Sequence, residues 1–458
     1  MKRMLRIGGL ALATATLAAT AWAGKGHHGP GKPPARDLGT EVLGPGDGWA
    51  AFGPGTTGGA AASADQIHVV TNRRELIAAL NDGRASSTSP ANASAAPKII
   101  YVQGVIDANV DDADNALSCD DYAAGTGYSL EAYLAAYDPD TWGRTTRPSG
   151  PLEDARIVAR NRQQARVRIR PGSNTTIVGL GKEATIRGAW FDLRGNSATD
   201  RRSNIIIRNL TFEDTFDCFP AWDPLDGAQG NWNAQYDAIS LREVENVWID
   251  HNTFRNVTTP NDSLPSYFSR KFEVHDGQVD ITNGSDLVTV SWNRFEGHDK
   301  LMLIGSSDGA TGDRGRLRVT LHHNLFDDAG QRAPRVRFGQ VHIYNNYYRI
   351  RNPDNYAYSW GVGIESQIYA EENFFFSLRQ ITPDRFIARF NGTALTAINN
   401  LHSGAPARRP LDVIGAWNAA NGFQLGRDAG WTPTLDAGLQ PAWTVPQTVL
   451  SNAGPMAW

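Results

Sequence analysis

The chain has 458 residues, of which 41% are hydrophobic and 20% are charged, and its formal net charge is −4. This composition excludes a disordered or fibrous protein, because there are enough apolar residues to bury one large core or two ordinary ones. The mildly acidic balance does not favour nucleic acid as a partner. An anionic ligand would have to be met by a local basic cleft.

The first 23 residues have the layout of a secretory signal. A positively charged start (Lys2, Arg3 and Arg6) precedes an apolar run, and Ala-Trp-Ala follows at the expected cleavage point. The apolar run is too short to span a membrane, so we expect a secreted, extracellular monomer without a membrane partner. The expected segments are a signal peptide at 1–23, a flexible leader at 24–40 and one domain at 41–458.

The only two cysteines, Cys119 and Cys218, can pair in an exported chain. Closing so long a loop would contribute roughly 4 kcal/mol in the chain-entropy model. Spacing alone favours a disulfide but leaves two buried thiols as the alternative. Neither cysteine is a catalytic candidate, because no neighbouring residue marks a thiolate-activating setting.

The N-terminal part of the domain is predicted to contain mixed elements. Residues 68–80 and 127–137 have the pattern of short helices, and residues 98–106 that of an early strand. Long insertions near 108–152 and 212–236 are expected to be loops that build the site on a rigid scaffold.

A repeat governs the rest of the chain. Each unit begins with alternating β-formers and ends in asparagine plus an aromatic residue, which indicates a strand entering a tight bend. Such a unit cannot bury its apolar side alone, so neighbours stack about 4.8 Å apart into an all-β, single-stranded, parallel β-helix. The asparagines should form a hydrogen-bonded ladder, with successive separations of 43, 41, 31, 22, 27 and 27 residues; they are Asn209, Asn252, Asn293, Asn324, Asn346, Asn373 and Asn400.

The aromatic residues that follow these asparagines admit two interpretations. Phe254, Phe295, Phe326 and Phe375 could stack inside the core or form a platform for sugar rings. We favour core packing.

Charged residues fall at regular places in these repeats. Asp237 lies 15 residues before Asn252 and Asp280 lies 13 before Asn293, so both should begin strands of adjacent rungs, within reach of one cation. Asp276 can join them only if Gly277 permits a bend. Their hard oxygen ligands suit calcium.

Cations follow the aspartates along the chain. Lys300 and Arg332 lie seven and eight residues after their repeat asparagines, in the equivalent region of the next two rungs, and Arg337 follows. The residues therefore form a column in which a cation site adjoins a polyanion site. A merely solvated charged face is the alternative, and a second one makes Asp276 and Asp280 the acid and base of a glycoside hydrolase.

Several motifs then carry a resemblance. NWNAQYDAIS, VWIDHNTF, DGQVDITNGSDLVTVSWNRFEGHDK, IGSSD and LHHNLFDDAGQRAPRVRFGQVHIYNNYY occur in the family's order within a match from about residue 45 to beyond 400. Together they resemble the bacterial extracellular pectate lyases of polysaccharide lyase family 1. The resemblance implies a right-handed parallel β-helix with short N-terminal helices and long loops that form a substrate cleft.

The same resemblance implies roles for individual residues. Arg332 matches the catalytic base, and Lys300 and Arg337 match the groups that bind substrate carboxylates. Some family members have a further acidic ligand where this chain has Gln235. His251 as a general base is an alternative that the charged column disfavours. The expected Ca²⁺ ligands are Asp237, Asp276 and Asp280.

The expected activity is β-elimination of de-esterified polygalacturonate to 4,5-unsaturated oligogalacturonates, in the degradation of pectin. The rival functions are a calcium-independent pectin lyase, a polygalacturonate hydrolase and a non-catalytic binder of acidic glycans. The aspartates disfavour the first, the three cations the second, and Arg332 beside an acidic cluster the third.

Overall fold

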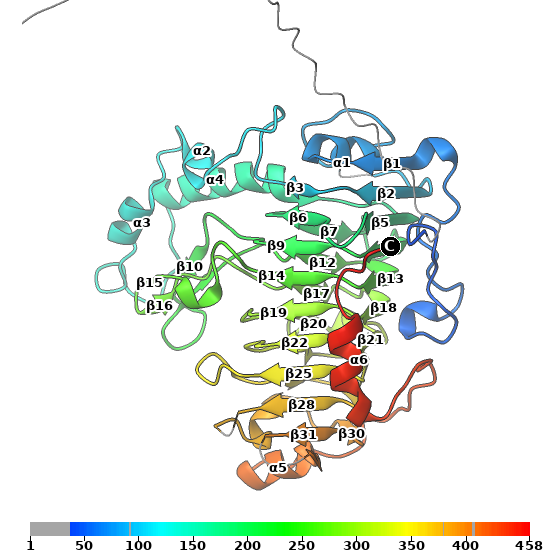
Figure 1. The fold of residues 1–458 in the computed structure, drawn as a ribbon. Coiled ribbons are helices and arrows are strands. Elements are labelled where there is room, and N and C mark those ends of the chain that lie inside the picture. The colour runs from blue at the N-terminus through cyan, green and yellow to red at the C-terminus, as the bar shows by residue number, and fades with distance from the viewer. Residues whose placement is uncertain (1–36, 91–92, 379, 405–407) are drawn as a thin grey trace, which may run out of the picture. The chain divides into compact units, whose positions relative to one another are not determined.

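Three long sheets wind around one core (Figure 1). The computed structural model describes residues 37–90, 93–378, 380–404 and 408–458. We name the three sheets A, B and C. After β4, and apart from two short hairpins, successive strands belong to sheets A, C and B in turn and then start the next rung, which confirms the predicted parallel β-helix.

The strands of each sheet pair in parallel, except for the last pair of sheet C. Sheet A contains β1 (Ile67–Val70), β2 (Lys98–Val102), β5 (Thr175–Gly179), β8 (Arg202–Arg208), β13 (Val244–Asp250), β18 (Asp286–Ser291), β21 (Val319–His322), β24 (Gln340–Tyr344), β27 (Gln367–Glu371) and β30 (Thr396–Ile398). Sheet B contains β4 (Arg168–Ile169), β7 (Trp190–Arg194), β12 (Ile239–Arg242), β17 (Val279–Thr282), β20 (Leu303–Ile304), β23 (Arg335–Val336), β26 (Trp360–Gly363) and β29 (Ile387–Phe390). Sheet C contains β3 (Val105–Asp107), β6 (Thr185–Arg187), β9 (Thr211–Glu213), β14 (Thr253–Arg255), β19 (Arg294–Glu296), β22 (Leu325–Asp327), β25 (Tyr347–Ile350), β28 (Phe374–Ser377), β31 (Leu401–Ser403) and the antiparallel β32 (Arg408–Pro410).

The bend between sheets A and C holds the predicted asparagine ladder. Asn252, Asn293 and Asn324 are fully buried. The side-chain N–H of each donates to the side-chain oxygen, Oδ1, of the next asparagine at 2.9–3.0 Å. The same oxygens accept backbone N–H groups, so the bend leaves few polar groups unpaired. Asn209 departs from the pattern, because its amide bonds the carbonyls of Gly179, Gly181 and Met456 instead.

The aromatic residues after the ladder stack in the core. Phe254 and Phe295 lie 4.9 Å apart between ring centroids with planes inclined by only 5°, and Phe326 continues the stack at 5.2 Å. Tyr348 then separates Phe326 from Phe375. All five rings are buried, which confirms core packing over a sugar platform.

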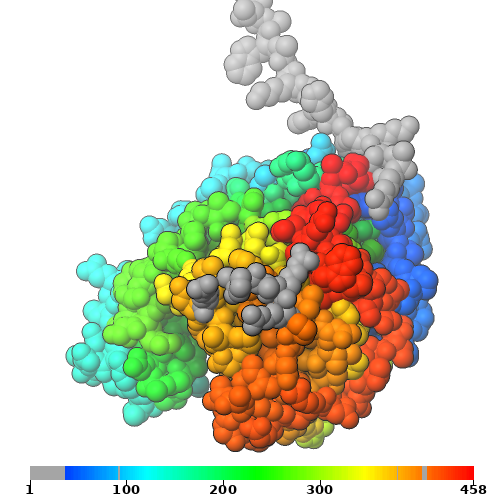
Figure 2. Space-filling view, turned by 60° about the horizontal axis from the view of Figure 1, so that its bottom comes forward, coloured from blue at the N-terminus to red at the C-terminus, as the bar shows by residue number. Residues whose placement is uncertain are grey.

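Helices close both ends of the core. At one end, α1 (Arg73–Leu80) buries Leu76, Ile77 and Leu80 in the main cluster; at the other end, α5 (Val413–Ala420) buries Val413 and Ile414 there. The orange region of α5 and the red region near α6 (Val445–Asn452) lie at the forward surface in Figure 2. Terminal helices of this kind keep the last rungs from exposing apolar edges.

Some local predictions were wrong. Residues 68–70 belong to strand β1, and only 73–80 are helical; α3 (Leu130–Ala136) lies within the second predicted helix. The 17-residue α4 (Pro151–Val167) was not predicted at all. The insertions also hold structure rather than loops alone: α2 (Cys119–Ala123) and the hairpin β10 (Ala221–Asp223) with β11 (Asn231–Asn233). A second hairpin joins β15 (Ser266–Tyr267) to β16 (Arg270–Lys271).

The N-terminal strap, residues 47–59, crosses the strands of sheet A. Its backbone N–H groups donate to side chains on β21, β18, β8 and β5 in turn, and these acceptors are Thr320, Thr289, Asn204 and Thr176. A side chain at Gly58 would approach within 2.2 Å of the Thr176 hydroxyl, so only glycine allows the strap to lie this close.

The C-terminal strap, residues 454–458, runs back along the β-helix to the early rungs, as Figure 1 shows. Gly454 donates to the Trp292 carbonyl at 2.7 Å, and Met456 donates to Asn209 Oδ1 at 2.7 Å. Trp458 Nε1 reaches the Gly179 carbonyl at 2.9 Å. Both straps therefore connect rungs that are not neighbours.

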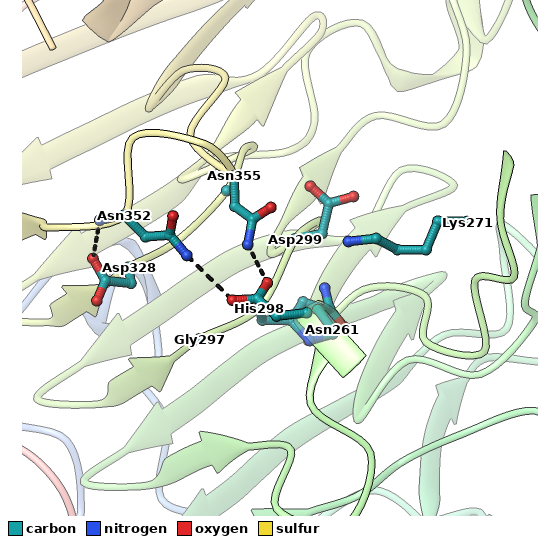
Figure 3. A pocket seen from close by; sticks show the side chains of 10 residues that line it. Asn261, Lys271, Gly297, His298, Asp299, Asp328, Asn352 and Asn355 are labelled. Atoms are coloured by element: carbon teal, nitrogen blue, oxygen red, sulfur yellow. Dashed lines mark hydrogen bonds between the residues drawn. The ribbon is translucent and has the colours of Figure 1, made fainter. Parts of the chain in front are cut away.

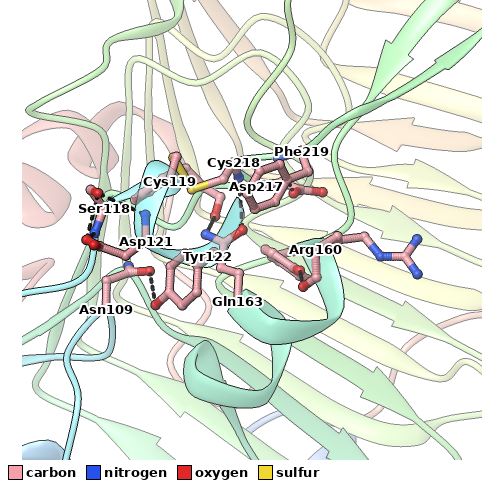
Figure 4. The surroundings of a disulfide bond; sticks show 12 residues. Asn109, Ser118, Cys119, Asp121, Tyr122, Arg160, Gln163, Asp217, Cys218 and Phe219 are labelled. Carbon is pink, nitrogen blue, oxygen red and sulfur yellow. Dashed lines mark hydrogen bonds between the residues drawn. A yellow bond between two sulfur atoms is a disulfide. The ribbon is translucent and has the colours of Figure 1, made fainter. Parts of the chain in front are cut away.

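A disulfide joins Cys119 to Cys218, which confirms the favoured pairing (Figure 4). It links α2 to the segment before β10, and Gln163 of α4 accepts the backbone N–H of Cys218 at 2.9 Å. Tyr122 and Phe219 pack in the same small apolar cluster. The insertion at 108–152 is thereby fixed to the body of the β-helix.

The predicted signal peptide and the leader up to residue 36 lie outside the described residues. Of the remaining leader, Leu38 is fully buried and Asp37 accepts a hydrogen bond from the Tyr101 hydroxyl. In the described part of the chain, no helix is both long and apolar enough to cross a membrane.

Candidate active site

Sheet B brings the predicted site residues to four neighbouring strands in the order β12, β17, β20 and β23. Asp237 lies two residues before β12, and Asp280 is the second residue of β17. Lys300 precedes β20, while Arg332 and Arg337 flank β23. Aspartates, lysine and arginines therefore follow one another along the sheet, as the repeat spacing predicted.

Gly277 lies closely against two carboxylates. A Cβ atom added there would lie 2.5 Å from Asp280 Oδ1 and 2.8 Å from Asp237 Oδ1. The backbone N–H of Gly277 also donates to Asp237 Oδ1 at 2.9 Å. Only glycine allows the two carboxylates to approach the backbone this closely, and the chain bends at the next residue, Gln278.

Burial and mutual repulsion make these carboxylates hard to ionise. Burial, followed by the charges of Asp280 and Asp276, raises the pKa of Asp237 well above its usual value. Burial and the Asp276 charge raise the pKa of Asp280 to about 7, although Arg332 acts in the opposite direction. A divalent cation bound by the two carboxylates would relieve this repulsion.

Asp276 stands apart from this pair. In the described residues no three acidic, histidine or cysteine side chains gather closely enough to hold a metal ion by themselves. Asp276 acts on its neighbours through charge, and its backbone carbonyl accepts a hydrogen bond from His298 Nε2 at 2.7 Å. Since Ca²⁺ takes six to eight oxygen ligands, the remaining ones would have to come from substrate and water.

Arg332 sits on a β-bulge. Lys300 pairs with Gln331, whereas Leu303 pairs with Arg335, so three steps on one strand oppose four on the next. Arg332 is the residue near the extra step with a positive φ of 60°. This conformation costs roughly 1 kcal/mol, and the charge of Arg332 acts to lower the pKa of Asp280.

Arg337 is already engaged within the protein. Its side chain is 9% exposed, its Nε lies 2.6 Å from Asp308 Oδ1, and its Nη1 donates to the Gly305 carbonyl at 2.9 Å. Between Arg332 and Arg337, Arg335 stacks on Phe390, with Cζ 3.7 Å from the ring centroid. Burial and the charges of Arg337 and Arg332 lower the pKa of Arg335.

A polar hollow borders this site (Figure 3). Asp299, the residue before Lys300, lines it together with Lys271 and Asn261. Asn352 and Asn355 donate their amides to Asp262 at its edge. The hollow therefore lies alongside the charged column on the loops that lead into β20 and β23.

Several residues that support the site were missed from the sequence. Trp190 Nε1 donates to Ser240 Oγ at 2.7 Å, and Ser240 donates to Asp237 Oδ2. His298 holds the Asp276 backbone, and Glu273 is buried with one carboxylate oxygen unpaired. Only the pairing of strands reveals these contacts, although Ser240 and His298 lie within motifs that were recognised.

The fold and the order of charges together define a β-helix enzyme for an acidic polymer. A family described as "Pectate lyase" matches residues 152–421. A pectate lyase of Bacillus subtilis (strain 168) is 42% identical over 424 residues, which cover 92% of this chain and 94% of that protein. The chain belongs to the pectate lyase family.

Solved structures agree with this assignment. A thermostable pectate lyase superposes with a TM-score of 0.87 at 44% identity, covering 92% of this chain and all 100% of that one. A pectate lyase bound to a hexasaccharide superposes with a TM-score of 0.83 at 40% identity, covering 92% and 99%. The family and the β-helix expected from the motifs are therefore confirmed.

Proposed function

We propose that the chain is a secreted, calcium-dependent pectate lyase that cleaves de-esterified polygalacturonate by β-elimination and so contributes to pectin degradation. One observation carries the proposal: two mutually repelling carboxylates, Asp237 and Asp280, meet at Gly277, with Asp280 one strand away from Lys300 and two strands away from Arg332. A hexasaccharide-bound relative of 40% identity supports an oligosaccharide substrate.

Asp237, Asp276 and Asp280 would hold Ca²⁺, which when bound neutralises a substrate carboxylate and acidifies the adjacent carbon. Lys300 binds the same kind of group by charge. Arg337 contributes through whichever of its N–H groups remain after its pairing with Asp308, and it fixes the loop that carries this partner.

Arg332 acts as the base in this scheme. Its guanidine takes the proton from C5, the electrons of that C–H bond form the C4–C5 double bond, and the C4–O bond breaks, with the leaving oxygen protonated by water. The charges of Arg337 and Arg332 both act on Arg335, so the three arginines lie close together beside β23.

The product distinguishes this function from its rivals, since only elimination creates a conjugated double bond. Ultraviolet absorbance should rise during digestion of polygalacturonate, and a chelator should abolish the rise. Full activity after removal of calcium, or a preference for highly methylated pectin, would favour a pectin lyase. Reducing ends without new absorbance would favour a hydrolase.

Secretion and a monomeric state belong to the same proposal. The Cys119–Cys218 disulfide suits an oxidising compartment. Fractionation of the host culture and sedimentation of the purified protein test the two points.

A further inference from the structure

Arginines line a second hollow, which adjoins the charged column at Asp276. It lies over β4, β7 and β12, the three strands at one end of sheet B. Arg168, Arg194 and Arg242 line it, together with Asp276 and Gln235. Arg242 is the register partner of Arg194, and Arg168 is the partner of Trp190. The basic hollow therefore continues the column on the side opposite Lys300.

Trp190 holds two of these arginines in place. The indole is 3% exposed, and the guanidinium carbons of Arg168 and Arg242 lie 5.9 and 5.6 Å from its ring centroid. The indole nitrogen is bound to Ser240, which in turn binds Asp237. Positioned in this way, the guanidinium groups lose little conformational freedom on meeting a ligand.

The lining of this hollow contains three arginines and one aspartate. The buried Asp192 lies 3.4 Å from Arg170 Nε and 3.5 Å from Arg194 Nε. Among the described residues, the side chain of Arg242 has neither an ion pair nor a hydrogen bond. The side chain of Arg168 has only a 3.4 Å hydrogen bond to Gln164. Burial and the neighbouring Arg170 lower the pKa of Arg168, although Asp192 acts in the opposite direction.

We infer that Arg168, Arg194 and Arg242 bind substrate carboxylates directly, one or two sugar units beyond the calcium ligands. The inference rests on the proposed function and extends its cleft. The three strands lie about 4.8 Å apart and adjoin the site at Asp276; Arg194 and Arg242 are paired in register, whereas Arg168 pairs with Trp190, four residues earlier on β7. A guanidinium fork matches the two oxygens of a carboxylate, so no cation is needed here.

The test compares substrate lengths. A trigalacturonate is cleaved only when one of its glycosidic bonds lies at Arg332. Its kcat/KM therefore reports only on sugar units bound near that residue. Arg242→Ala should lower kcat/KM for hexagalacturonate about tenfold, the usual value of a charged hydrogen bond, and should change that for the trimer less than about twofold. The matched control is Arg74→Ala, which removes one positive charge from the exposed face of α1.

Two results would overturn the inference. An equal loss for both lengths would mean that Arg242 acts only through the field at Asp237 and Asp280. An unchanged hexamer would mean that the side chain does not contact the polymer. If Arg242→Ala does not fold, as judged by its melting temperature, Arg194→Gln is measured with the same expected length dependence.

Binding without turnover separates this inference from the proposed function. In an Arg332→Ala background, calorimetry with hexagalacturonate and calcium should show about tenfold weaker binding when Arg242→Ala is added. A wild-type enzyme that forms no conjugated product would overturn the proposed function alone, since this binding difference would still support the arginine subsite. Equal hexamer binding with and without Arg242→Ala would overturn the subsite alone.

Discussion

The asparagine ladder and the outer face of sheet B are built from the same rungs but treat polar groups in opposite ways. In the ladder, each buried amide meets an identical partner one rung away. On sheet B, like charges crowd together, Arg332 has a positive φ, and buried polar atoms such as Arg332 Nε and Glu273 Oε1 lack partners. One corner of the repeat thus stabilises the fold, while one face keeps unmet interactions for a ligand.

The largest expected effect is at the base. Arg332→Lys keeps a cation but changes its reach and basicity, so kcat should fall at least about 10²-fold while substrate binding is retained. The melting temperature should stay near that of the wild type, because the side chain contributes little to the core. Wild-type activity should rise into the alkaline range; an optimum near pH 5 would point to a carboxylate base instead.

The ladder should show the converse behaviour. Asn324→Ala removes four buried hydrogen-bond partners and should lower the free energy of unfolding by about 2 kcal/mol or more, as measured by denaturant titration. The kcat of the folded fraction should not change. Asn452→Ala, on the exposed face of α6, is the control and should cost under about 0.5 kcal/mol. Equal costs at both positions would remove the contrast between ladder and surface.

A variant of Asp280 should affect both activity and stability. Asp280→Asn should reduce activity at least about tenfold in saturating calcium, since a charged ligand is lost. In chelator the same variant should melt at a higher temperature than the wild type at pH 8, because a repelling charge is gone. Asp140→Asn, at an exposed position, should do neither. A lower melting temperature in chelator would mean that the carboxylates do not repel each other as described.

The smallest expected effect is at Glu273. Burial raises its pKa to about 7, with Lys300 acting in the opposite direction. A raised carboxyl pKa destabilises the folded state as pH rises from about 4.5 through 7. Glu273→Gln should therefore gain stability relative to wild type between pH 5 and pH 8, as measured by denaturant titration at the two pH values. Parallel stability curves for the two proteins would contradict the shift.

The sequence was sufficient to predict what repeats. The ladder register follows because each asparagine must satisfy the same bend, and the column on sheet B follows from counting outward from that register. The bulge at Arg332 could not be predicted, because one extra residue becomes visible only when Gln331 and Arg335 are paired with their neighbours.

Other parts of the site depend on contacts between insertions and rungs. The burial of Arg337 follows from Asp308, which approaches from a loop whose path no periodicity describes. Helix α4 was missed because it buries few residues per turn, among them Arg156 and Gln163, and so lacks a clear apolar stripe. The close approach of two carboxylates to Gly277 could be found only from the positions of two side chains from different strands.

The two straps give this repeat protein a property that stacked rungs alone would not have. Rungs that touch only their neighbours can be added or removed one at a time, and they unfold as weakly coupled units. Here Met456 meets Asn209 across 247 residues of sequence, and residues 47–59 span β5 to β21. Each strap therefore fits only one number of rungs between its anchor points. Deleting a rung would shift every anchor by about 4.8 Å, so the straps restrict how this scaffold can change length during evolution and make its middle rungs melt together.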